Sequence, residues 1–399
     1  MKTEIILVFC LIVLIAAQAS CRGFSFGKNY DGELGTGTTT KEISPTAIRL
    51  NAPLIAAAAG YSHSVVVTSD YKAFSFGSNF LGRLGAKSNV NYTTTPIAVF
   101  EGGALRGEKI IKVSCSVFHS LLLSESGCLF GFGYNGAGEI GVQGVDVVNE
   151  PIAVDARGLL NGKKVSGMDT GNYHSIGYTS DGIAFAFGSN EAFQLGTGTP
   201  ESSSVAVPVN TNGLLKGKKI VGVAAGFKHS LVLTSEGLAY SFGGNEYGQL
   251  GNGRYYFWEK LPVAVATNGT LKGKTIVAVS ASAYHSAVIT SDGGLFMFGN
   301  NNASHGQLGT GDRAVTALPL AIKRSMELEN KKVVQVSCGT SHSLLTTSEG
   351  DVYATGLNDQ GQLGFGTTIF ESFTFQPIMK NDTLNYKQTA SGDSHSIVI

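Results

Sequence analysis

A histidine-serine pair recurs seven times along this chain of 399 residues, at intervals of 53 to 57 residues. Six of the histidines are followed fourteen residues later by a glycine, while the seventh lies near the C-terminus and an unpaired Gly27 lies near the N-terminus. The chain therefore reads as seven copies of one unit, circularly cut inside the last copy, and this pattern predicts a closed ring. The pairs are His63/Gly77, His119/Gly133, His174/Gly188, His229/Gly243, His285/Gly299 and His342/Gly356, with His395 left to complete Gly27.

Within each unit the residue pattern is that of short β-strands. Residues 64–68 and 73–76 are apolar or β-branched runs separated by the turn 69–72, and residues 55–60 form an earlier run of small side chains. Short apolar runs bracketed by Ser, Asp and Gly predict hairpins, and a constant spacing fixes their register. We expect an all-β, seven-bladed β-propeller whose ring is closed by N- and C-terminal strands sharing one blade.

The repeated residues resemble the regulator of chromosome condensation repeat family. Its signature is a Gly-x-x-His-Ser strand start followed by Phe-Gly-x-Asn-x-x-Gly-Gln-Leu-Gly, and the clearest copy spans residues 226–230 and 242–251. The resemblance covers the chain after its first twenty residues and implies a seven-bladed propeller. The family includes a nuclear exchange factor for a small GTPase, a plant photoreceptor and secreted bacterial β-lactamase inhibitors, so the resemblance does not choose a function.

The N-terminus resembles a signal peptide over residues 1–19, with Lys2, an apolar run from Ile5 to Ala17 and a small-residue cleavage site. An uncleaved anchor is the alternative. Residues 20–399 are then one propeller domain, secreted or lumenal. Sequons that would suit a glycoprotein begin at four positions, and four cysteines remain, with no pairing assigned. The sequons begin at Asn91, Asn268, Asn302 and Asn381, and the cysteines are Cys21, Cys115, Cys128 and Cys338.

The charges are balanced, with 29 basic and 29 acidic residues. A nucleic-acid-binding protein usually needs a basic excess, so we expect no nucleic-acid partner. Lysines recur ten residues before a histidine and acids seven after it, which predicts a solvated rim on the face away from the histidines. The lysines are Lys109, Lys164, Lys219 and Lys332, with Lys274 one residue off, and the acids are Asp70, Asp181, Glu236, Asp292 and Glu349.

The seven histidines are interpreted as structural, since a catalytic group is needed once and not in every copy. A histidine at each strand start could satisfy local backbone groups, and the nearby asparagine and glycine suit a left-handed turn. No paired carboxylates, nucleophile motif, phosphate loop or cluster of metal ligands stands out. We therefore expect no enzyme activity, no metal and no cofactor.

Departures from the repeat indicate where a partner binds. The connection after Gly251 carries four consecutive aromatics where other copies are mostly polar, and Tyr, Trp and Arg are favoured interface residues. A second aromatic loop includes Phe370 and Phe373, and His305 lies in a two-residue insertion. The predicted contacts are Arg254, Tyr255, Tyr256, Phe257 and Trp258, then His305, Phe370 and Phe373.

The leading hypothesis is a non-catalytic, monomeric propeller scaffold that binds a protein partner, or a glycan, through loops on the histidine-bearing face. The alternative is guanine-nucleotide exchange on a small GTPase, the activity most associated with the family. The signal peptide argues against that alternative, and so do the intervals from each glycine to the next histidine, which leave no room for a long extra hairpin.

Overall fold

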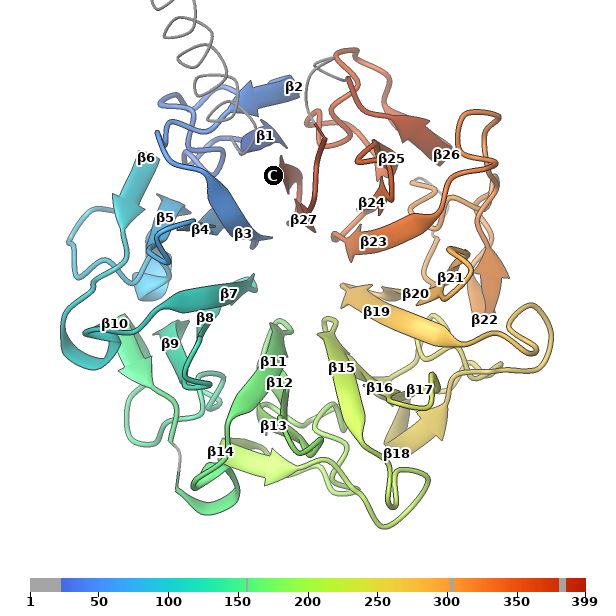
Figure 1. Cartoon of the computed structure of the whole chain (residues 1–399), viewed down its shortest axis with the longest axis horizontal. Coiled ribbons are helices and arrows are strands. Elements are labelled where there is room, and N and C mark those ends of the chain that lie inside the picture. The colour runs from blue at the N-terminus through green and yellow to red at the C-terminus, as the bar shows by residue number, and fades with distance from the viewer. Residues whose placement is uncertain (1–22, 156, 302–304, 380–384) are drawn as a thin grey trace, which may run out of the picture.

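The structure is a computed structural model, described here for residues 23–155, 157–301, 305–379 and 385–399. In these residues twenty-eight strands form seven four-stranded antiparallel sheets, arranged as blades around a central axis (Figure 1). The prediction of an all-β, seven-bladed propeller is confirmed. The predicted signal peptide and Cys21 lie outside the described residues.

In six of the seven blades the innermost strand comes first in the chain, and the next three strands follow outward. Blade 1 contains β3 (Leu54–Ala59), β4 (His63–Thr68), β5 (Ala73–Ser78) and β6 (Tyr92–Ala98). Blade 2 contains β7 (Ile110–Cys115), β8 (His119–Ser124), β9 (Leu129–Tyr134) and β10 (Val147–Ala153). Blade 3 contains β11 (Val165–Thr170), β12 (His174–Thr179), β13 (Ala184–Gly188) and β14 (Ser203–Pro208).

Blades 4 to 6 follow the same order. Blade 4 contains β15 (Ile220–Ala225), β16 (His229–Thr234), β17 (Ala239–Gly244) and β18 (Trp258–Ala264). Blade 5 contains β19 (Ile276–Ser282), β20 (His285–Thr290), β21 (Leu295–Gly299) and β22 (Thr316–Ala321). Blade 6 contains β23 (Val333–Cys338), β24 (His342–Thr347), β25 (Val352–Leu357) and β26 (Glu371–Pro377). Short 3-10 helices lie at Phe80–Gly82, Gly103–Leu105 and Gly158–Leu160.

The closing blade takes its strands from both ends of the chain: β27 (Thr389–Ser391), β28 (His395–Val398), β1 (Phe24–Gly27) and β2 (Glu42–Ala47). Strand β1 pairs with β28 so that Gly27 lies opposite His395, which is the pairing found in the other six blades. The fourteen-residue spacing is thus a strand register, as predicted. Pairing the two ends leaves no gap in the ring.

The core lies between neighbouring blades. In five blades and the closing blade, a buried Phe precedes the hairpin glycine, and it packs under the glycine of the Leu-Gly turn in the preceding blade. At Gly35 a Cβ would meet the Phe76 ring at 2.9 Å, and φ is +65°, so only glycine fits without strain. Burying each such ring stabilises the fold by about 1.5–3 kcal/mol. The rings are Phe26, Phe76, Phe132, Phe187, Phe242 and Phe298.

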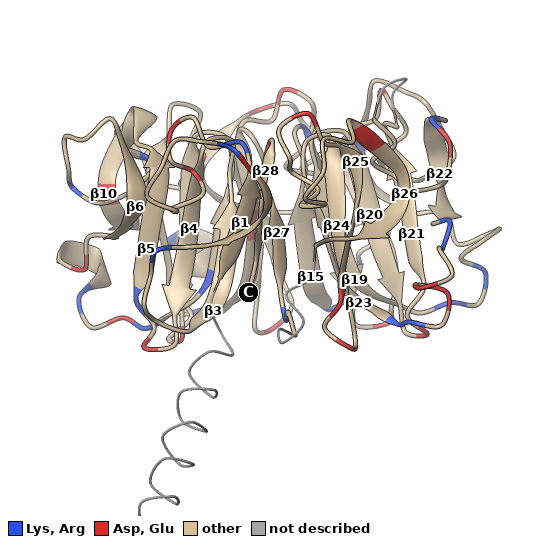
Figure 2. Cartoon of the chain, turned by 90° about the horizontal axis from the view of Figure 1, so that it is seen from above, with Lys and Arg blue, Asp and Glu red and all other residues tan. Residues whose placement is uncertain are grey.

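The molecule has two unlike faces, seen from the side in Figure 2. We call the face at the histidine ends of the strands the histidine face, and it carries the loops that follow the third strand of each blade. The opposite face carries the hairpin turns and the connections between blades, and Phe24 and Val398 pair toward it. No helix among the described residues is long and apolar enough to cross a membrane.

Candidate partner-binding face

The histidines form an uninterrupted ring of hydrogen bonds beneath the histidine face. Each imidazole Nε2 lies 2.8–2.9 Å from the serine Oγ of the next blade, and all fourteen side chains are fully buried. The prediction that each histidine bonds local backbone groups is therefore wrong, because its side chain bonds a serine across the blade interface. The pairs are His63–Ser120, His119–Ser175, His174–Ser230, His229–Ser286, His285–Ser343, His342–Ser396 and His395–Ser64.

The serines determine the direction of these bonds. Ser286 donates its hydroxyl proton to the Gln249 carbonyl at 2.8 Å, and five equivalent serines donate to the equivalent turns at 2.7–2.9 Å, while Ser120 lies 3.5 Å from the Arg83 carbonyl. Since the serine proton is used, the histidine donates from Nε2 and Nδ1 carries the lone pair. Burial lowers the pKa of His229 to about 3, so the imidazole is neutral. A neutral, fully buried side chain suits a structural role.

The asparagine two residues past each hairpin glycine folds the loop that follows. Asn245 accepts a hydrogen bond from the Leu250 amide at 3.0 Å, and its Nδ2 donates to the Arg254 carbonyl at 2.9 Å. None of the seven asparagines has a positive φ, so the interpretation of a left-handed turn is wrong for them. Their side chains satisfy loop backbone groups, which gives each loop a defined shape on the histidine face.

The aromatic loop of blade 4 is fixed at one end and exposed in its middle. The Tyr255 hydroxyl accepts from the Ala317 amide at 3.0 Å and lies 3.3 Å from the Val315 carbonyl, which binds it to blade 5. Tyr256 and Phe257 are 60% and 70% exposed, and Trp258, the first residue of β18, is 46% exposed. The Arg254 guanidinium lies 4.0 Å from the Glu259 carboxylate. The loop therefore displays aromatic rings at the rim without being loose.

Phe193 supports this loop from the neighbouring blade, which the sequence did not suggest. It occupies the position that is Gly in the other six copies of the Gly-Gln-Leu-Gly turn, and its φ is +62°. Its ring lies 5.9 Å from the Trp258 ring, with the Lys260 ammonium 5.2 Å from its centroid. A side chain in left-handed backbone is strained, and such outliers gather at functional sites. The absence of the repeat glycine at position 193 is the sequence signal that could have identified this residue.

The second predicted loop reaches blade 5 from the other side. The Arg313 guanidinium lies 4.6 Å from the Phe373 ring and bonds to Glu371 at 2.6 Å. Phe370 is 59% exposed, whereas Phe375 is fully buried, where it fills the space that Thr355 leaves at the Phe position of blade 6. His305 is half-buried beside Gly306, whose missing side chain makes room for Phe373.

The two aromatic loops contact the same segment, residues 313–317 of blade 5, so the predicted residues form one stretch of rim over blades 4 to 6.

A further group of aromatics lies around the central mouth of the histidine face, and the sequence analysis missed it. Four half-buried rings follow one another across blades 2 to 5, with centroids 5.4–6.2 Å apart: Phe118, Tyr173, Phe227 and Tyr284. They stand one or two residues before the repeat histidines, a register that could have revealed them. We call them the aromatic arc. The arc lines a hollow of about 670 Å³ that opens into the central channel.

Arg83 ends the aromatic arc. It replaces the Gln of the repeat, is almost fully buried, and donates to the Phe80 and Val117 carbonyls at 2.8 and 3.0 Å. Its guanidinium lies 5.5 Å from the Phe80 ring and 5.6 Å from the Phe118 ring. Burial lowers its pKa to about 10, so it stays charged at neutral pH.

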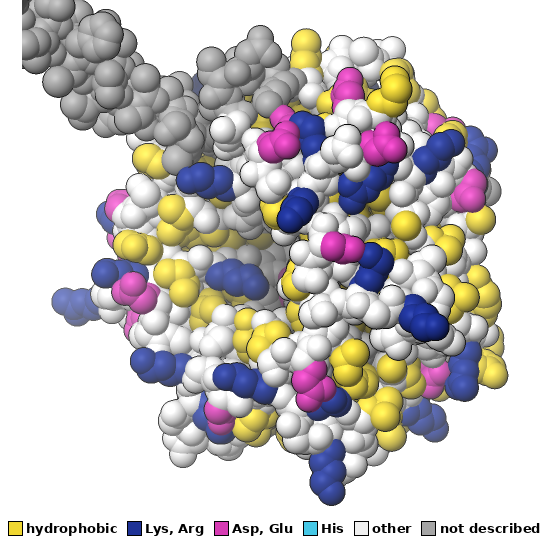
Figure 3. All heavy atoms as spheres, turned by 45° about the vertical axis from the view of Figure 1, so that its right-hand side comes forward, with side chains coloured by type: hydrophobic (Ala, Val, Ile, Leu, Met, Phe, Trp, Pro, Cys, Tyr) yellow, Lys and Arg dark blue, Asp and Glu magenta, His cyan; other side chains and the backbone are white. Residues whose placement is uncertain are grey.

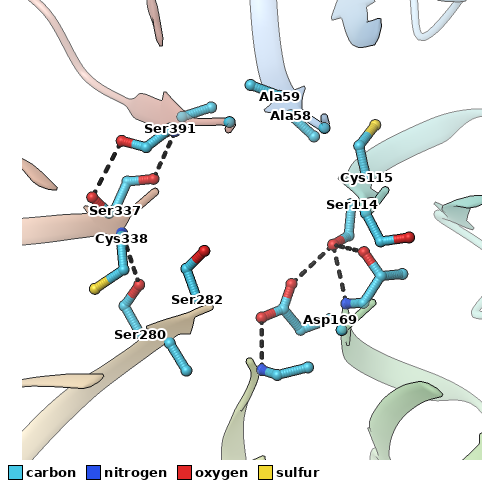
Figure 4. Close-up of a pocket in the computed structure, with 18 of the residues that line it drawn as sticks. Ala58, Ala59, Ser114, Cys115, Asp169, Ser280, Ser282, Ser337, Cys338 and Ser391 are labelled. Carbon is cyan, nitrogen blue, oxygen red and sulfur yellow. Dashed lines mark hydrogen bonds between the residues drawn. The ribbon is translucent and has the colours of Figure 1, made fainter. Parts of the chain in front are cut away.

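The channel itself is narrow and polar, lined by the innermost strands (Figure 4). Asp169 accepts from Ser114 Oγ at 2.8 Å and from the Ala225 amide at 2.9 Å, which links three adjacent blades, and burial raises its pKa. Burial also raises the pKa of the Cys115 and Cys338 thiols to about 12, which disfavours the reactive thiolate. The described part of the chain holds no group of three metal-ligating side chains.

The opposite face carries the periodic charges, and Figure 3 shows basic and acidic side chains interspersed around the depression at the centre of this face. Five lysines on this face form ion pairs with acidic residues, and four of these lysines stand eleven residues before the repeat histidine. The predicted spacing of ten residues is therefore wrong by one residue in three blades. In these blades the paired lysines are Lys163, Lys218 and Lys331, not Lys164, Lys219 and Lys332. Lys274 and Lys109 pair as well. Each pair joins the connection before a blade to that blade's hairpin turn. Exposed pairs of this kind contribute little stability.

Comparison with known proteins places the chain in a family. Residues 22–398 match the RCC1-like domain, and the chain belongs to this family of propellers. It is 29% identical over 369 residues to the Ultraviolet-B receptor UVR8 of Arabidopsis thaliana, covering 91% of this chain and 78% of UVR8. It is 28% identical over 353 residues to the human Regulator of chromosome condensation, covering 84% and 80% of the two chains.

The solved structure of Prp20p from Saccharomyces cerevisiae has the same fold, with a TM-score of 0.81 at 19% identity over 95% of this chain and 91% of that one. The resemblance to the regulator of chromosome condensation repeat family is thus confirmed.

Proposed function

We propose that the protein is a non-catalytic propeller scaffold, secreted or lumenal, that binds a protein partner through the rim of its histidine face. The contacts centre on Arg254, Tyr256, Phe257 and Trp258, with Phe370 in the second loop. The observation that carries the proposal is the exposed aromatic loop braced by the strained Phe193. Exposed aromatics held in a defined shape lose little conformational entropy on binding, which is typical of interface anchors.

The test is capture of partners from a secretory fraction on the immobilised protein, with identification by mass spectrometry. The double substitution Tyr256→Ala/Phe257→Ala removes two exposed rings that make no hydrogen bond with the rest of the described chain, so we expect the fold to survive. Recovery of the partner should fall at least about tenfold, the loss typical of removing one interface anchor.

Tyr92→Ala is the matched control, because Tyr92 opens β6 at the position that Trp258 occupies in β18 and is 50% exposed. Equal recovery with the double variant and the control would rule out the rim of blade 4.

The secretory location rests on the signal-peptide pattern of residues 1–19. Microscopy of a C-terminally tagged protein tests it, together with removal of N-glycans, which should shift the mobility of a protein modified at Asn91 or Asn268. Both asparagines are exposed. A nuclear or cytosolic pool with no glycan would contradict the proposal.

Nucleotide exchange on a small GTPase is the second candidate, and membership of the family favours it. The structure of Prp20p was reported with its binding to Gsp1p and histones. Release of a fluorescent guanine nucleotide from purified small GTPases tests this candidate. Under the scaffold proposal we expect this protein not to accelerate nucleotide release. The release rate with the Tyr256→Ala/Phe257→Ala variant should equal the rate measured without protein.

A further inference from the structure

We infer that the mouth of the central channel is a binding site for a neutral saccharide, separate from the rim of blades 4 to 6. The inference starts from the aromatic arc. Each of its rings is half-buried, so each is held by its neighbours and still presents part of its surface to the hollow. Tyr134 and Tyr247 support the arc from behind, at 6.2 Å from Phe118 and 5.1 Å from Tyr284. The rings therefore form a preorganised surface.

The same hollow carries polar groups with unused hydrogen-bonding capacity. The Asn172 amide and the hydroxyls of Ser282, Thr340, Tyr173 and Tyr284 line it or project from the arc, and none has a hydrogen-bond partner among the described residues. Elsewhere in the ring the repeated serine and asparagine side chains make hydrogen bonds, and the six histidine Nδ1 atoms without a partner among the described residues belong to fully buried side chains. Free donors and acceptors beside apolar rings therefore mark a place where a ligand can replace water.

The charges of the hollow indicate what kind of ligand fits. Two carboxylates, Asp31 and Asp393, line it from the closing blade, opposite the arc. Arg83 is the cation in the lining, and it already donates to two carbonyls beneath the surface. The Lys28 ammonium, beside the lining residue Ser62, already donates to the Ser62 hydroxyl at 3.1 Å and lies 3.9 Å from the buried Glu33 carboxylate. An anionic ligand would meet two carboxylates without a free cation, which disfavours acidic sugars and phosphates.

A neutral sugar matches both halves of the hollow. Its C–H faces can pack on aromatic rings, and its hydroxyls can donate to the carboxylates and bond with the amide and hydroxyl groups. A hollow of about 670 Å³ lies within the range of sites for small ligands. The curved row of rings across four blades favours a chain of two or three sugar units over a single one. An extended peptide is the competing occupant, and the test includes it.

Saturation-transfer NMR on the full chain tests the site with three trisaccharides (cellotriose, mannotriose and N-acetylated chitotriose) and with a proline hexapeptide, each at about 5 mM, which detects dissociation constants near 1 mM. We expect transfer to the ring protons of at least one trisaccharide. Tyr173→Ala should weaken that binding about tenfold, and Tyr173→Phe, which keeps the ring, should retain most of it. Asn172→Ala removes only an unpartnered amide, so the fold should be unaffected and binding should weaken at least about threefold.

Tyr256→Ala is the control, because it removes a rim side chain and should leave the saccharide signal unchanged. Loss of partner capture without loss of saccharide binding would separate this site from the proposed function. The inference is overturned by any of three results: no transfer to any trisaccharide, transfer that persists in both Tyr173→Ala and Asn172→Ala, or Tyr173-dependent transfer to a proline hexapeptide in place of the sugars.

Discussion

At the scale of single residues, the serine after each histidine links neighbouring blades through its hydroxyl. Ser286 receives the Nε2–H of His229 and donates to the Gln249 carbonyl, so one hydroxyl satisfies two groups of the preceding blade. Ser286→Ala leaves a buried donor and a buried acceptor without partners. We expect the free energy of unfolding to fall by about 2–3 kcal/mol, measured by urea denaturation. Ser291→Ala, an exposed serine of the same blade, should change it by less than about 0.5 kcal/mol.

A buried carboxylate gives a second prediction at this scale. Glu139 stands where four copies have Gln, is fully buried, and has one oxygen without a partner among the described residues. Burial raises its pKa, so the charged form costs stability once the pH exceeds the ordinary value of 4.5, and the cost is absent below it. Glu139→Gln keeps the acceptor for the Ala137 amide. It should add about 1 kcal/mol at pH 7 and nothing at pH 4, in thermal unfolding at the two values. The reverse change, Gln249→Glu, should destabilise at pH 7 only.

The residue scale also shows what the sequence could and could not predict. The strand register was predictable, because His285 and Gly299 recur at a constant distance in neighbouring strands. The histidine's partner was not, because Ser286 bonds a residue 57 positions away in another blade, and sequence spacing does not say which blade surfaces meet. Lys218 shows the same limit: two adjacent lysines fit the repeat equally well, and only the turn geometry decides which one reaches Glu236.

At the scale of elements, the turn holding Phe193 joins blade 3 to the aromatic loop of blade 4. Phe193→Ala keeps the left-handed backbone strained and removes the ring, whereas Phe193→Gly removes both the ring and the strain. The glycine variant should therefore be more stable than the alanine variant by about 1 kcal/mol, in urea denaturation of the two proteins. Both variants should shift the fluorescence of Trp258, the single tryptophan, to longer wavelength as its ring loses cover. Equal stability of the two variants would mean that the turn is not strained.

The two aromatic loops illustrate which elements a sequence can place. Four adjacent aromatics after Gly251 stand out against polar copies, and Tyr256 and Phe257 are indeed exposed. Phe375, in the second aromatic run, belongs to the core because Thr355 leaves room for its ring. This compensation involves two different strands, so the sequence of one strand alone does not indicate it. The aromatic arc was missed for a related reason. Its members come from four separate blades, so each looks like a single aromatic residue until the ring closes.

At the scale of the whole molecule, closure makes the seven blades depend on one another. His342 bonds Ser396 and His395 bonds Ser64, so the hydrogen-bonded ring passes through the closing blade without interruption. Strand β28 is fully buried although it lies at the end of the chain. The seven histidine–serine pairs belong to one cooperative structure, so their effects on its stability add. We expect the summed effect to appear at acidic pH.

The seven imidazoles are neutral in the folded ring, and burial lowers the pKa of each, to about 3 for His119, His174, His229, His342 and His395 and about 4 for His285. His63 is lowered as well. In the unfolded chain histidine titrates near pH 6.5. Between about pH 6 and pH 4 the unfolded chain therefore binds more protons, and stability falls as the pH falls. Each histidine contributes up to about 1.4 kcal/mol per pH unit, so seven can remove most of the stability of a domain within two units.

Buried acids act in the opposite direction but are fewer. Burial raises the pKa of Glu33, Glu139 and Asp169, so their protonation favours the fold as the pH falls toward and below 4.5. Three such groups, starting at lower pH, cannot offset seven histidines. We expect the melting temperature, followed by circular dichroism, to drop steeply between pH 6.5 and 4.5, with cooperative loss of all blades at once. His229→Gln should reduce the proton uptake on unfolding at pH 5 by about one, because it removes one titrating group from the unfolded chain. A melting temperature that stays constant from pH 7 to pH 5 would show that protons enter the ring without opening it.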